Sequence, residues 1–486
     1  MHQISIPIIG LAVAVFVLIF LILRTKVHPL IAMLFAACIA GLTAGMSVTE
    51  TTQAITKGFG STLGTIGIII GLGVMMGRIL EVSGAAEQIG YSLIKRLGVR
   101  REAWALAITG YFVSIPIFAD SAFVILYPIA KASAKKGNRS VLTMGVALAG
   151  GLVVTHTMVP PTPGPLGVAG IFGVDVGAMM LLGLILAIPC TISFVLYAIW
   201  LGKKYSDNSE ETIIDEDLKN IQDKYLTDKA VRPLPSLTLS LLPIVVPIVL
   251  ILIPAVINLF PALSVSEVPF SRFIVQAFNF AGTPFIALCI STLLAVYTLV
   301  PYLDRPETSA RLEEGLQSAG MILMVIGAGG ALGFVVRESG VGTQLAAQIA
   351  HLPFSPIMIP FFVATAVRLI QGSGTVAMIT AASITAPILK QVPGINMLFA
   401  AQAAAMGAFC FSYFNDALFW VVNRMMGITD VKKQLMTWSI PTTICWAVGG
   451  ALIALVNLAF GSGGTLLDPV IPLLGLGIIF LVVRRK

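Results

Sequence analysis

Ionisable side chains occur inside long apolar stretches at four places in the sequence, and helix-breaking residues lie beside each of them. The groups concerned are Asp120, His156, Arg368 and Asp416. A charged side chain at the centre of a bilayer costs roughly 2.5–3.5 kcal/mol on insertion scales, so such a residue is a candidate for a functional site. A carboxyl group or an imidazole can carry a proton, and a guanidinium can hold a carboxylate through two parallel hydrogen bonds. The residue types therefore predict a site that handles an organic anion together with a cation.

The first place is the segment SIPIFADSAFVILYP, residues 114–128. Pro116 breaks the incoming helix, and Asp120 with Ser121 offers an N-cap for the outgoing helix. The free N–H groups at a helix N-terminus suit an anion. Asp120 would repel an anion unless it were protonated or balanced by a cation. We therefore assign Asp120 to the coupling ion and Ser121 to the substrate; the alternative for this pair is a plain N-cap.

The second place is RLIQGSGTVAMITAASITAP, residues 368–387. Its glycines and hydroxyl residues break one helix and start another, about one helical turn after Arg368. We predict that Arg368 recognises a substrate carboxylate. The alternatives are an arginine that snorkels to the interface or one that forms a structural ion pair. The residues expected to bind substrate with it are Gln371, Gly372, Ser373, Gly374 and Thr375.

The third place is VVTHTMVPPTPGPLGVAG, residues 153–170. Its prolines cannot continue a regular helix, so we predict an unwound segment at 155–165 that exposes carbonyl and hydroxyl groups. His156 is a candidate proton carrier because its unperturbed pKa lies near ~6.5. A buried core histidine is the alternative. The substrate-binding candidates in this segment are Thr157, Thr162 and Gly164.

The fourth place is CFSYFNDALFWVVNR, residues 410–424, which we interpret as a broken helix at the matching position of the second half of the chain. Asn415 is a candidate for substrate binding. Asp416 is a candidate to carry the proton or to bind an arginine. A structural ion pair between Asp416 and Arg424 is the alternative.

The composition requires these segments to lie in a membrane. Of the 486 residues, 57% are hydrophobic and 11% are charged, whereas soluble domains carry about 25% charged residues. Water-soluble enzymes are therefore excluded, and the familiar catalytic motifs are missing, so we expect no enzyme and no cofactor. The five cysteines show no CxxC spacing, which argues against disulfides and a metal site. The net charge of +7 comes from short basic clusters between apolar runs, which argues against a nucleic-acid partner.

The apolar stretches predict an all-α polytopic membrane protein. A span needs about 20 mainly apolar residues, and about eleven stretches meet that requirement. Two further stretches, 103–130 and 357–390, are interrupted near their middles. Irregular backbone at membrane depth survives only where protein buries it or where it lines a cavity, so we predict two re-entrant helical hairpins. The predicted spans are roughly 4–23, 28–46, 60–80, 140–158, 175–201, 237–260, 280–301, 315–336, 397–421, 434–460 and 466–483.

Basic residues set the expected orientation. They gather after the first span, on both sides of the first hairpin, directly after residue 202 and at the C-terminus. The positive-inside rule places these loops in the cytoplasm. The N-terminus is then outside and the C-terminus cytoplasmic, in a multi-pass protein of the bacterial inner membrane. Arg78 and Glu81 end a predicted span, so we expect them to face headgroups or water and give them no site role.

A polar stretch divides the chain into halves that resemble each other. Residues 69–89 align with residues 325–345, and the predicted topology makes the two copies antiparallel. Inverted repeats with broken helices are typical of secondary transporters, whose site lies near the midplane where the repeats meet. The predicted units are a first inverted repeat at 1–202, a cytoplasmic linker at 203–236, a second repeat at 237–460 and a C-terminal span at 461–486.

Together the motifs resemble the gluconate permease family of bacterial gluconate:proton symporters, within the wider ion transporter superfamily. The segments that carry the resemblance are GFGSTLGTIGIIIGLGVMMG, SIPIFADSAFVI, THTMVPPTPGPLG, RLIQGSGTVA and SYFNDALFW. The resemblance implies import of gluconate or a related hydroxy or sugar acid with protons. It also implies a homodimer in the lipid bilayer, elevator-type motion and a site formed by the residues named above.

Two departures from the family pattern affect the expected substrate. Family members typically carry histidine where this chain has Thr162, and again where it has Tyr413. The lost polar groups favour a different or smaller small hydroxycarboxylate, so glycerate stands beside gluconate, with D-serine as a more distant alternative. Sodium stands beside the proton as coupling ion. A cation/proton antiporter is the alternative from another functional class, and Arg368 argues against it because an antiporter needs no anion site.

Overall fold

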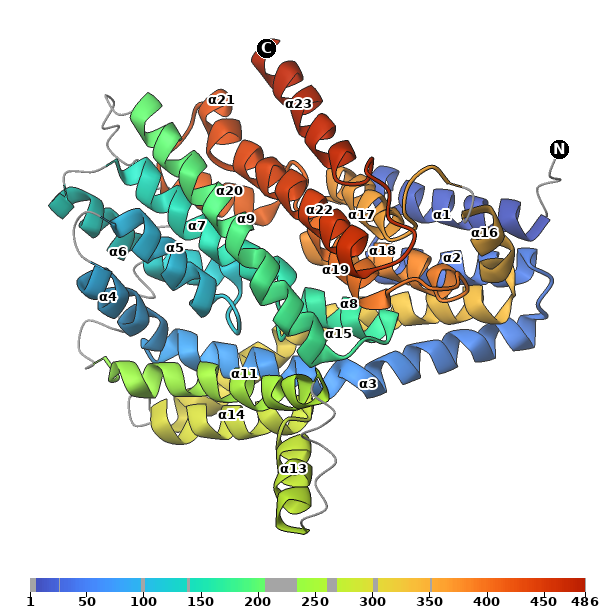
Figure 1. Ribbon diagram of the computed structural model, residues 1–486, viewed down its shortest axis with the longest axis horizontal. Coiled ribbons are helices and arrows are strands. Elements are labelled where there is room, and N and C mark those ends of the chain that lie inside the picture. The colour runs from blue at the N-terminus through green and yellow to red at the C-terminus, as the bar shows by residue number, and fades with distance from the viewer. Residues whose placement is uncertain are drawn as a thin grey trace.

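The computed structural model describes residues 6–25, 27–97, 101–137, 140–205, 234–259, 269–299, 305–349 and 352–485. Within these ranges the regular structure is helical (Figure 1). The predicted linker at 203–236 lies largely outside the described residues. Helices α8 (Pro163–Phe172), α18 (Gly374–Leu389) and α19 (Met397–Gly407) occupy the middle of the molecule and are almost entirely buried.

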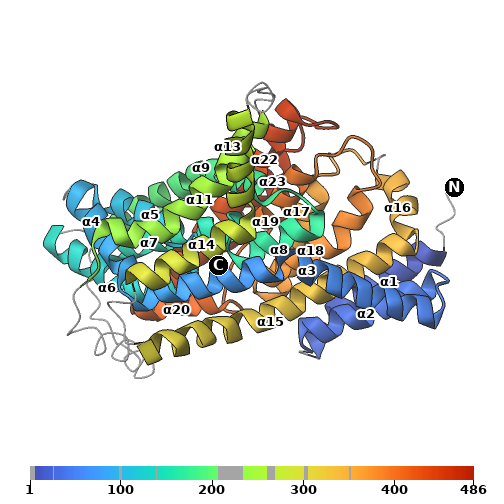
Figure 2. The ribbon, with the colours of Figure 1, turned by 90° about the horizontal axis from the view of Figure 1, so that it is seen from below.

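Two long helices pair along their whole lengths, α3 (Val48–Val82) and α15 (Arg305–Glu338) (Figure 2). A Cβ added to Gly58 would lie 2.7 Å from a backbone oxygen near the end of α15. At the other end, a Cβ added to Gly315 would lie 3.4 Å from the Cβ of Arg78. The pair is therefore antiparallel, and missing side chains let the two backbones approach closely.

The first predicted hairpin region contains two helices, α5 (Glu102–Val113) and α6 (Ala119–Gly137). Residues 114–118 separate them. Helix α6 begins at Ala119, so Asp120 lies inside its first turn and is not the N-cap that the sequence predicts. A carboxylate in the first turn still interacts favourably with the positive end of the helix dipole.

The unwound segment of the first half is shorter than predicted. Helix α7 (Val141–Met158) continues through His156, and α8 begins at Pro163, so 159–162 is non-helical rather than 155–165. The N–H of Val159 still donates to the Thr155 oxygen at 2.9 Å. A proline fits the first helical turn because no partner is needed for an N–H there, which lets α8 start inside the proline-rich run.

The second half contains two matching breaks. Helix α17 (Met358–Gln371) and α18 are separated by Gly372 and Ser373 alone. Gly372 has φ +87°, a left-handed conformation that favours glycine. Farther along, α19 ends at Gly407 and α20 spans Ala417–Met425, so the predicted broken helix at 410–424 consists of the end of a non-helical stretch, 408–416, followed by helix.

The described residues contain fewer long spans than the sequence predicts for the whole chain. Among the described residues, six helices are long and apolar enough to cross a membrane, or seven if α13 and α14, bent by 71°, form one span. Several predicted spans correspond to shorter apolar helices. The remaining elements are α1 (Ile6–Arg24), α2 (Pro29–Thr43), α4 (Ala85–Leu97), α9 (Val176–Lys204), α11 (Leu237–Leu259), α13 (Pro269–Ala281), α14 (Pro284–Leu299), α16 (Val341–Ile349), α21 (Val431–Gln434), a π-helical turn (Leu435–Ser439), α22 (Ile440–Phe460) and α23 (Val470–Arg485).

Candidate functional site

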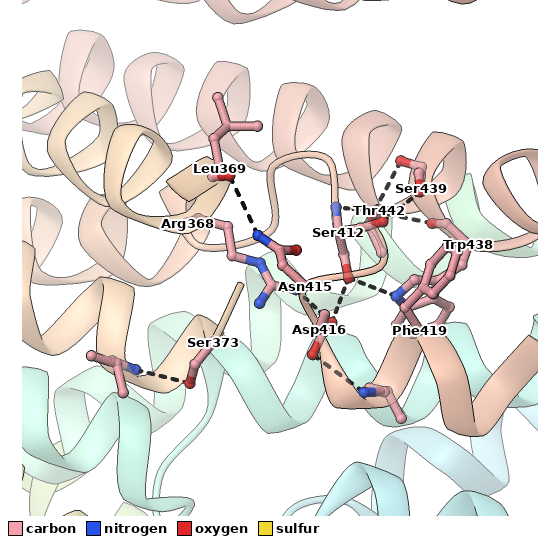
Figure 3. A network of polar contacts seen from close by, with 12 residues as sticks. Arg368, Leu369, Ser373, Ser412, Asn415, Asp416, Phe419, Trp438, Ser439 and Thr442 are labelled. Atoms are coloured by element: carbon pink, nitrogen blue, oxygen red, sulfur yellow. Dashed lines mark hydrogen bonds and ion pairs between the residues drawn. The ribbon is translucent and has the colours of Figure 1, made fainter. Parts of the chain in front are cut away.

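A buried ion pair joins two of the broken helices. Arg368 lies in the last turn of α17, and Asp416 caps the N-terminus of α20. Arg368 Nη2 is 2.7 Å from Asp416 Oδ2, and the two side chains are 7% and 13% exposed (Figure 3). Arg368 is thus buried inside the protein and does not snorkel to the interface. The partner that the structure shows for Asp416 is Arg368, whereas the sequence left Arg424 as the alternative.

Arg368 keeps further donors available. Its Nε and Nη1 atoms are buried and have no hydrogen-bond partner among the residues that the structure describes. Nη1 is directed towards the start of α18, because a Cβ added to Gly374 would lie 3.9 Å from it. The Oε1 atom of Gln371 and the Oδ1 atom of Asn415 are also buried without a partner. Such groups are costly unless they are paired, so this cluster suits a ligand that both accepts and donates hydrogen bonds.

Helix N-termini from the two halves meet beside this cluster. The Ser373 hydroxyl accepts a hydrogen bond from the N–H of Val376 at 3.4 Å and so caps α18. A Cβ added to Gly164, in the first turn of α8, would lie 3.5 Å from Thr375 Oγ1 in α18. The positive ends of both helix dipoles therefore lie close together, an arrangement that favours an anion.

The three candidate proton carriers form one electrostatic cluster. His156 Nδ1 is buried without a hydrogen-bond partner, and Asp120 and Asp416 both interact electrostatically with the imidazole. The His156 ring is 5.6 Å from the ring of Phe118, in the break before α6. The fold thus places the imidazole of α7 in the electrostatic field of one carboxyl group in α6 and one at the N-terminus of α20.

Thr162 and Thr157, two residues predicted to bind substrate, have different surroundings from the residues around Arg368. The Thr162 hydroxyl lies 2.9 Å from the His156 oxygen and 2.7 Å from the Val159 oxygen, so it is bound to the backbone of its own break. Thr157 is 6% exposed in the last turn of α7. Within the described part of the chain, no hydrogen bond joins Thr157 to Arg368. Thr162 stabilises the local turn, which proline-rich sequence alone does not reveal.

A cavity of about 290 Å³ lies beside the electrostatic cluster around His156, and Phe118 and Ser121 are among the residues that line it. Its wall also contains Arg78 and Glu81, to which the sequence gave no role. Arg78 is 2.7 Å from Glu81 and 2.6 Å from Glu314, so this ion-pair group links α3 to α15 at the cavity. The volume is close to the lower end of the roughly 300–1,000 Å³ typical of small-molecule sites.

Other residues at the site were missed from the sequence. Gln402, fully buried in α19, donates from Nε2 to the Met158 oxygen at 3.3 Å, at the end of α7. A lone amide within the run AAQAAA is a signal that could have identified it. Ser412 and Trp438 also connect to Asp416. Trp438 lies 26 positions from Ser412, so the sequence alone does not reveal that Trp438 connects to Asp416 through Ser412.

Comparison with known proteins places the chain among membrane permeases. The sequence model of the GntP family permeases matches residues 6–459. The chain belongs to this family. An uncharacterized permease of Haemophilus influenzae is 62% identical, over all of this chain and 99% of the relative. A gluconate permease of Pseudomonas aeruginosa is 33% identical, over 91% of this chain and 95% of the relative.

A solved structure gives an independent view of the fold of this permease. The YdaH transporter of Alcanivorax borkumensis superposes with a TM-score of 0.61 at 14% identity, covering 89% of this chain and 98% of that one. At this identity the likeness concerns the fold alone. Family and fold together identify a multi-pass membrane transporter rather than an enzyme.

Proposed function

We propose that the permease imports a small hydroxy or sugar acid, such as gluconate or glycerate, by proton symport across the bacterial cytoplasmic membrane. The observation that carries this proposal is the buried guanidinium of Arg368, whose Nε and Nη1 atoms lack partners beside the N-terminus of α18. The name of the P. aeruginosa relative supports an acid of the gluconate type. A cation/proton antiporter has no use for such a donor set.

Coupling follows from competition for Arg368. Without substrate, the Asp416 carboxylate forms an ion pair with Nη2 of the Arg368 guanidinium. A substrate carboxylate would bring a second negative charge into the same buried place, where like charges repel strongly. Protonation of Asp416 removes its charge and releases Arg368 for the substrate. The acid and the proton are therefore bound together, and neither is favoured alone.

Hydroxyl groups of the substrate would complete the site. The unpartnered Gln371 Oε1 and Asn415 Oδ1 atoms are acceptors for them. A site built to bind a hydroxyl rejects an analogue without it, because the protein groups are left unpaired. Asp416 would release its proton through His156 to Asp120, since Asp120 is the exposed member of the three and is adjacent to Ser121 of the cavity.

The halves 1–202 and 237–460 would form inverted repeats in an elevator-type homodimer. The antiparallel pairing of α3 and α15 supports this arrangement. A Cβ added to Gly67 would lie 3.9 Å from Leu323, and the two residues are 256 positions apart, like residues 69 and 325 of the aligned segments. Equivalent residues thus meet near the midpoints of equivalent helices, as two-fold symmetry requires. The helix pairs α5–α6 and α17–α18 would be the re-entrant hairpins.

Uptake by purified protein in liposomes tests the function. Labelled gluconate and glycerate are supplied under an imposed pH gradient and, separately, under a sodium gradient. We expect accumulation of at least one acid with the pH gradient alone. Accumulation driven only by sodium would replace the proton as coupling ion. Exchange of cations for protons with no movement of either acid would establish the antiporter and refute the proposal.

Substitution of Arg368 tests the anion site. Arg368→Lys keeps the charge but loses the planar fork, so we expect acid binding at least about 10-fold weaker at every pH. Arg368→Ala combined with Asp416→Ala removes both charges and should abolish binding without leaving a buried carboxylate unpaired. Arg337→Ala is the control, because Arg337 is 50% exposed and pairs with Glu338. Tight binding retained by Arg368→Lys and by the double variant would contradict the assignment.

A further inference from the structure

A chain of hydrogen bonds reaches Asp416 from a buried tryptophan. Trp438 Nε1 donates to Ser412 Oγ at 2.8 Å, and the Ser412 hydroxyl donates to Asp416 Oδ2, the oxygen that also pairs with Arg368 (Figure 3). Trp438 and Ser412 are 0% and 1% exposed. Water therefore does not compete for these bonds.

The π-helical turn Leu435–Ser439 positions the donors of this hydrogen-bond chain next to Ser412. The Ser439 hydroxyl donates to the backbone carbonyl oxygen of Ser412. Trp438 and Ser439, which are adjacent in the turn, therefore both bind Ser412. Thr442 Oγ1 accepts from the Ser412 N–H at 3.4 Å. From the first half of the chain, Tyr197 donates to the Met436 oxygen at 2.7 Å. Short π-helical insertions often occur at functional sites, and here one fixes Ser412 through its backbone and its side chain.

The direction of donation matters more than the contacts themselves. An indole N–H can only donate, so the hydroxyl oxygen of Ser412 accepts the hydrogen bond from Trp438. The Ser412 hydrogen is then directed at Asp416, which must accept. A proton on Oδ2 would direct a second donor at the Ser412 hydroxyl oxygen and deprive the Ser412 hydrogen of its acceptor, and a proton on Oδ1 would compete with the Leu418 N–H that donates to Oδ1 at 3.2 Å. The chain therefore favours the ionised carboxylate.

We infer that Trp438 and Ser412 are positioning residues that set the pH at which Asp416 takes up the coupling proton. Trp438 acts through Ser412 and does not touch the substrate. The chain holds the Asp416 side chain against Arg368 until acid and proton arrive together. This inference rests on the proposed function, because it assumes that Asp416 is the group that binds the proton.

The other charged and titratable groups around Asp416 are unchanged in the variants that test this. Among the described residues they are Arg368 in α17, His156 in α7, Asp120 in α6 facing His156, Arg424 in α20, and Cys410 and Tyr413 in the break before α20. A change in pH dependence after substitution of Trp438 or Ser412 is then attributable to the donor chain.

The test is the pH dependence of gluconate and glycerate binding by the purified full-length protein. We expect the midpoint to move to higher pH by about one unit in Ser412→Ala, as loss of one hydrogen bond to a carboxylate implies. Trp438→Phe should move it in the same direction by about half as much. Ser412→Thr retains the hydroxyl and should keep the wild-type midpoint, while saturating binding at low pH should persist in all three.

Trp446→Phe is the matched control. Trp446 is also buried, and its Nε1 donates to Thr365 Oγ1 at 2.8 Å instead of to Ser412. An unchanged midpoint in Ser412→Ala, or an equal shift in Trp446→Phe, would overturn the inference. Asp416→Asn separates the two levels of the argument. Binding by Asp416→Asn that keeps the wild-type pH dependence would refute the proposed coupling, whereas loss of pH dependence there with no shift in Ser412→Ala refutes the donor chain alone.

Discussion

At the scale of single residues, the site is distinguished by polar atoms that the protein leaves unsatisfied. Arg368 uses one nitrogen for Asp416 and keeps two buried nitrogens without partners, while Gln371 and Asn415 keep buried acceptor oxygens. A protein interior normally satisfies such atoms. Under the proposed function, their grouping beside two helix N-termini would bind a carboxylate and hydroxyl groups.

The acceptor on Asn415 gives a prediction about selectivity. Asn415→Ala removes an oxygen that would accept a substrate hydroxyl, so binding of glycerate should weaken by about 3- to 10-fold, as loss of a neutral hydrogen bond implies. Binding of propionate, which has the carboxylate but no hydroxyl groups, should be weak and unchanged. Competition against labelled glycerate measures both. Equal weakening for both acids would show that Asn415 does not recognise hydroxyl groups.

At the scale of elements, the helix breaks explain how these residues converge. Gly372 ends α17 with φ +87°, and an added Cβ there would lie 2.1 Å from the backbone oxygen of Asn415. The break therefore needs glycine both for its backbone conformation and for the close approach of the stretch before α20. That contact fixes α17 and α20 relative to each other, and with them Arg368 and Asp416.

Substitution of this glycine should abolish uptake. Gly372→Ala forces the two breaks apart, so we expect loss of gluconate and glycerate uptake and a lower unfolding temperature. Gly340 provides the matched control, because its φ is +72° but nothing lies within 4 Å of an added Cβ. Gly340→Ala should cost only the roughly 1–2 kcal/mol of left-handed strain and retain uptake. Equal loss in both variants would mean that strain alone, and not the contact with Asn415, is responsible.

The sequence was informative about breaks and less so about their limits. Pro and Gly residues identify three of the four interrupted places, because those residue types act locally on the backbone, whereas the place at 410–424 contains neither and is indicated by Asn415 and Asp416 within an apolar stretch. The limits of 155–165 were too wide, since Pro163 is compatible with a first helical turn and His156 keeps its helical bonds. Partners such as Trp438 for Ser412 were beyond reach, because only tertiary packing brings residues 26 positions apart into contact.

At the scale of the whole molecule, the antiparallel α3 and α15 place the cavity at one end of their shared axis. Arg78 and Ser121 line it, and α4 with its basic residues Lys95 and Arg96 follows directly after α3. We propose that this end faces the cytoplasm, as the positive-inside rule predicts from these basic residues. The cavity would then be the route by which substrate leaves the site, with Phe118 between it and His156.

This route predicts one-sided access to Ser121. In a background without Cys38 and Cys289, which are not buried, Ser121→Cys should react with a membrane-impermeant maleimide from the cytoplasmic side. Bound gluconate or glycerate should slow the reaction. Thr157→Cys is the control, because Thr157 is buried and should stay unreactive. Labelling of Ser121→Cys only from the outside would reverse the assigned direction of the cavity.

The most direct test of the account is to count protons as the acid binds. Purified protein in weakly buffered solution near neutral pH is titrated with gluconate and glycerate, and a pH indicator records proton uptake. The exchange of Asp416 for substrate on Arg368 predicts about one proton taken up per acid bound by the wild type and none by Asp416→Asn. Binding by the wild type without proton uptake, or equal uptake by Asp416→Asn, would contradict it.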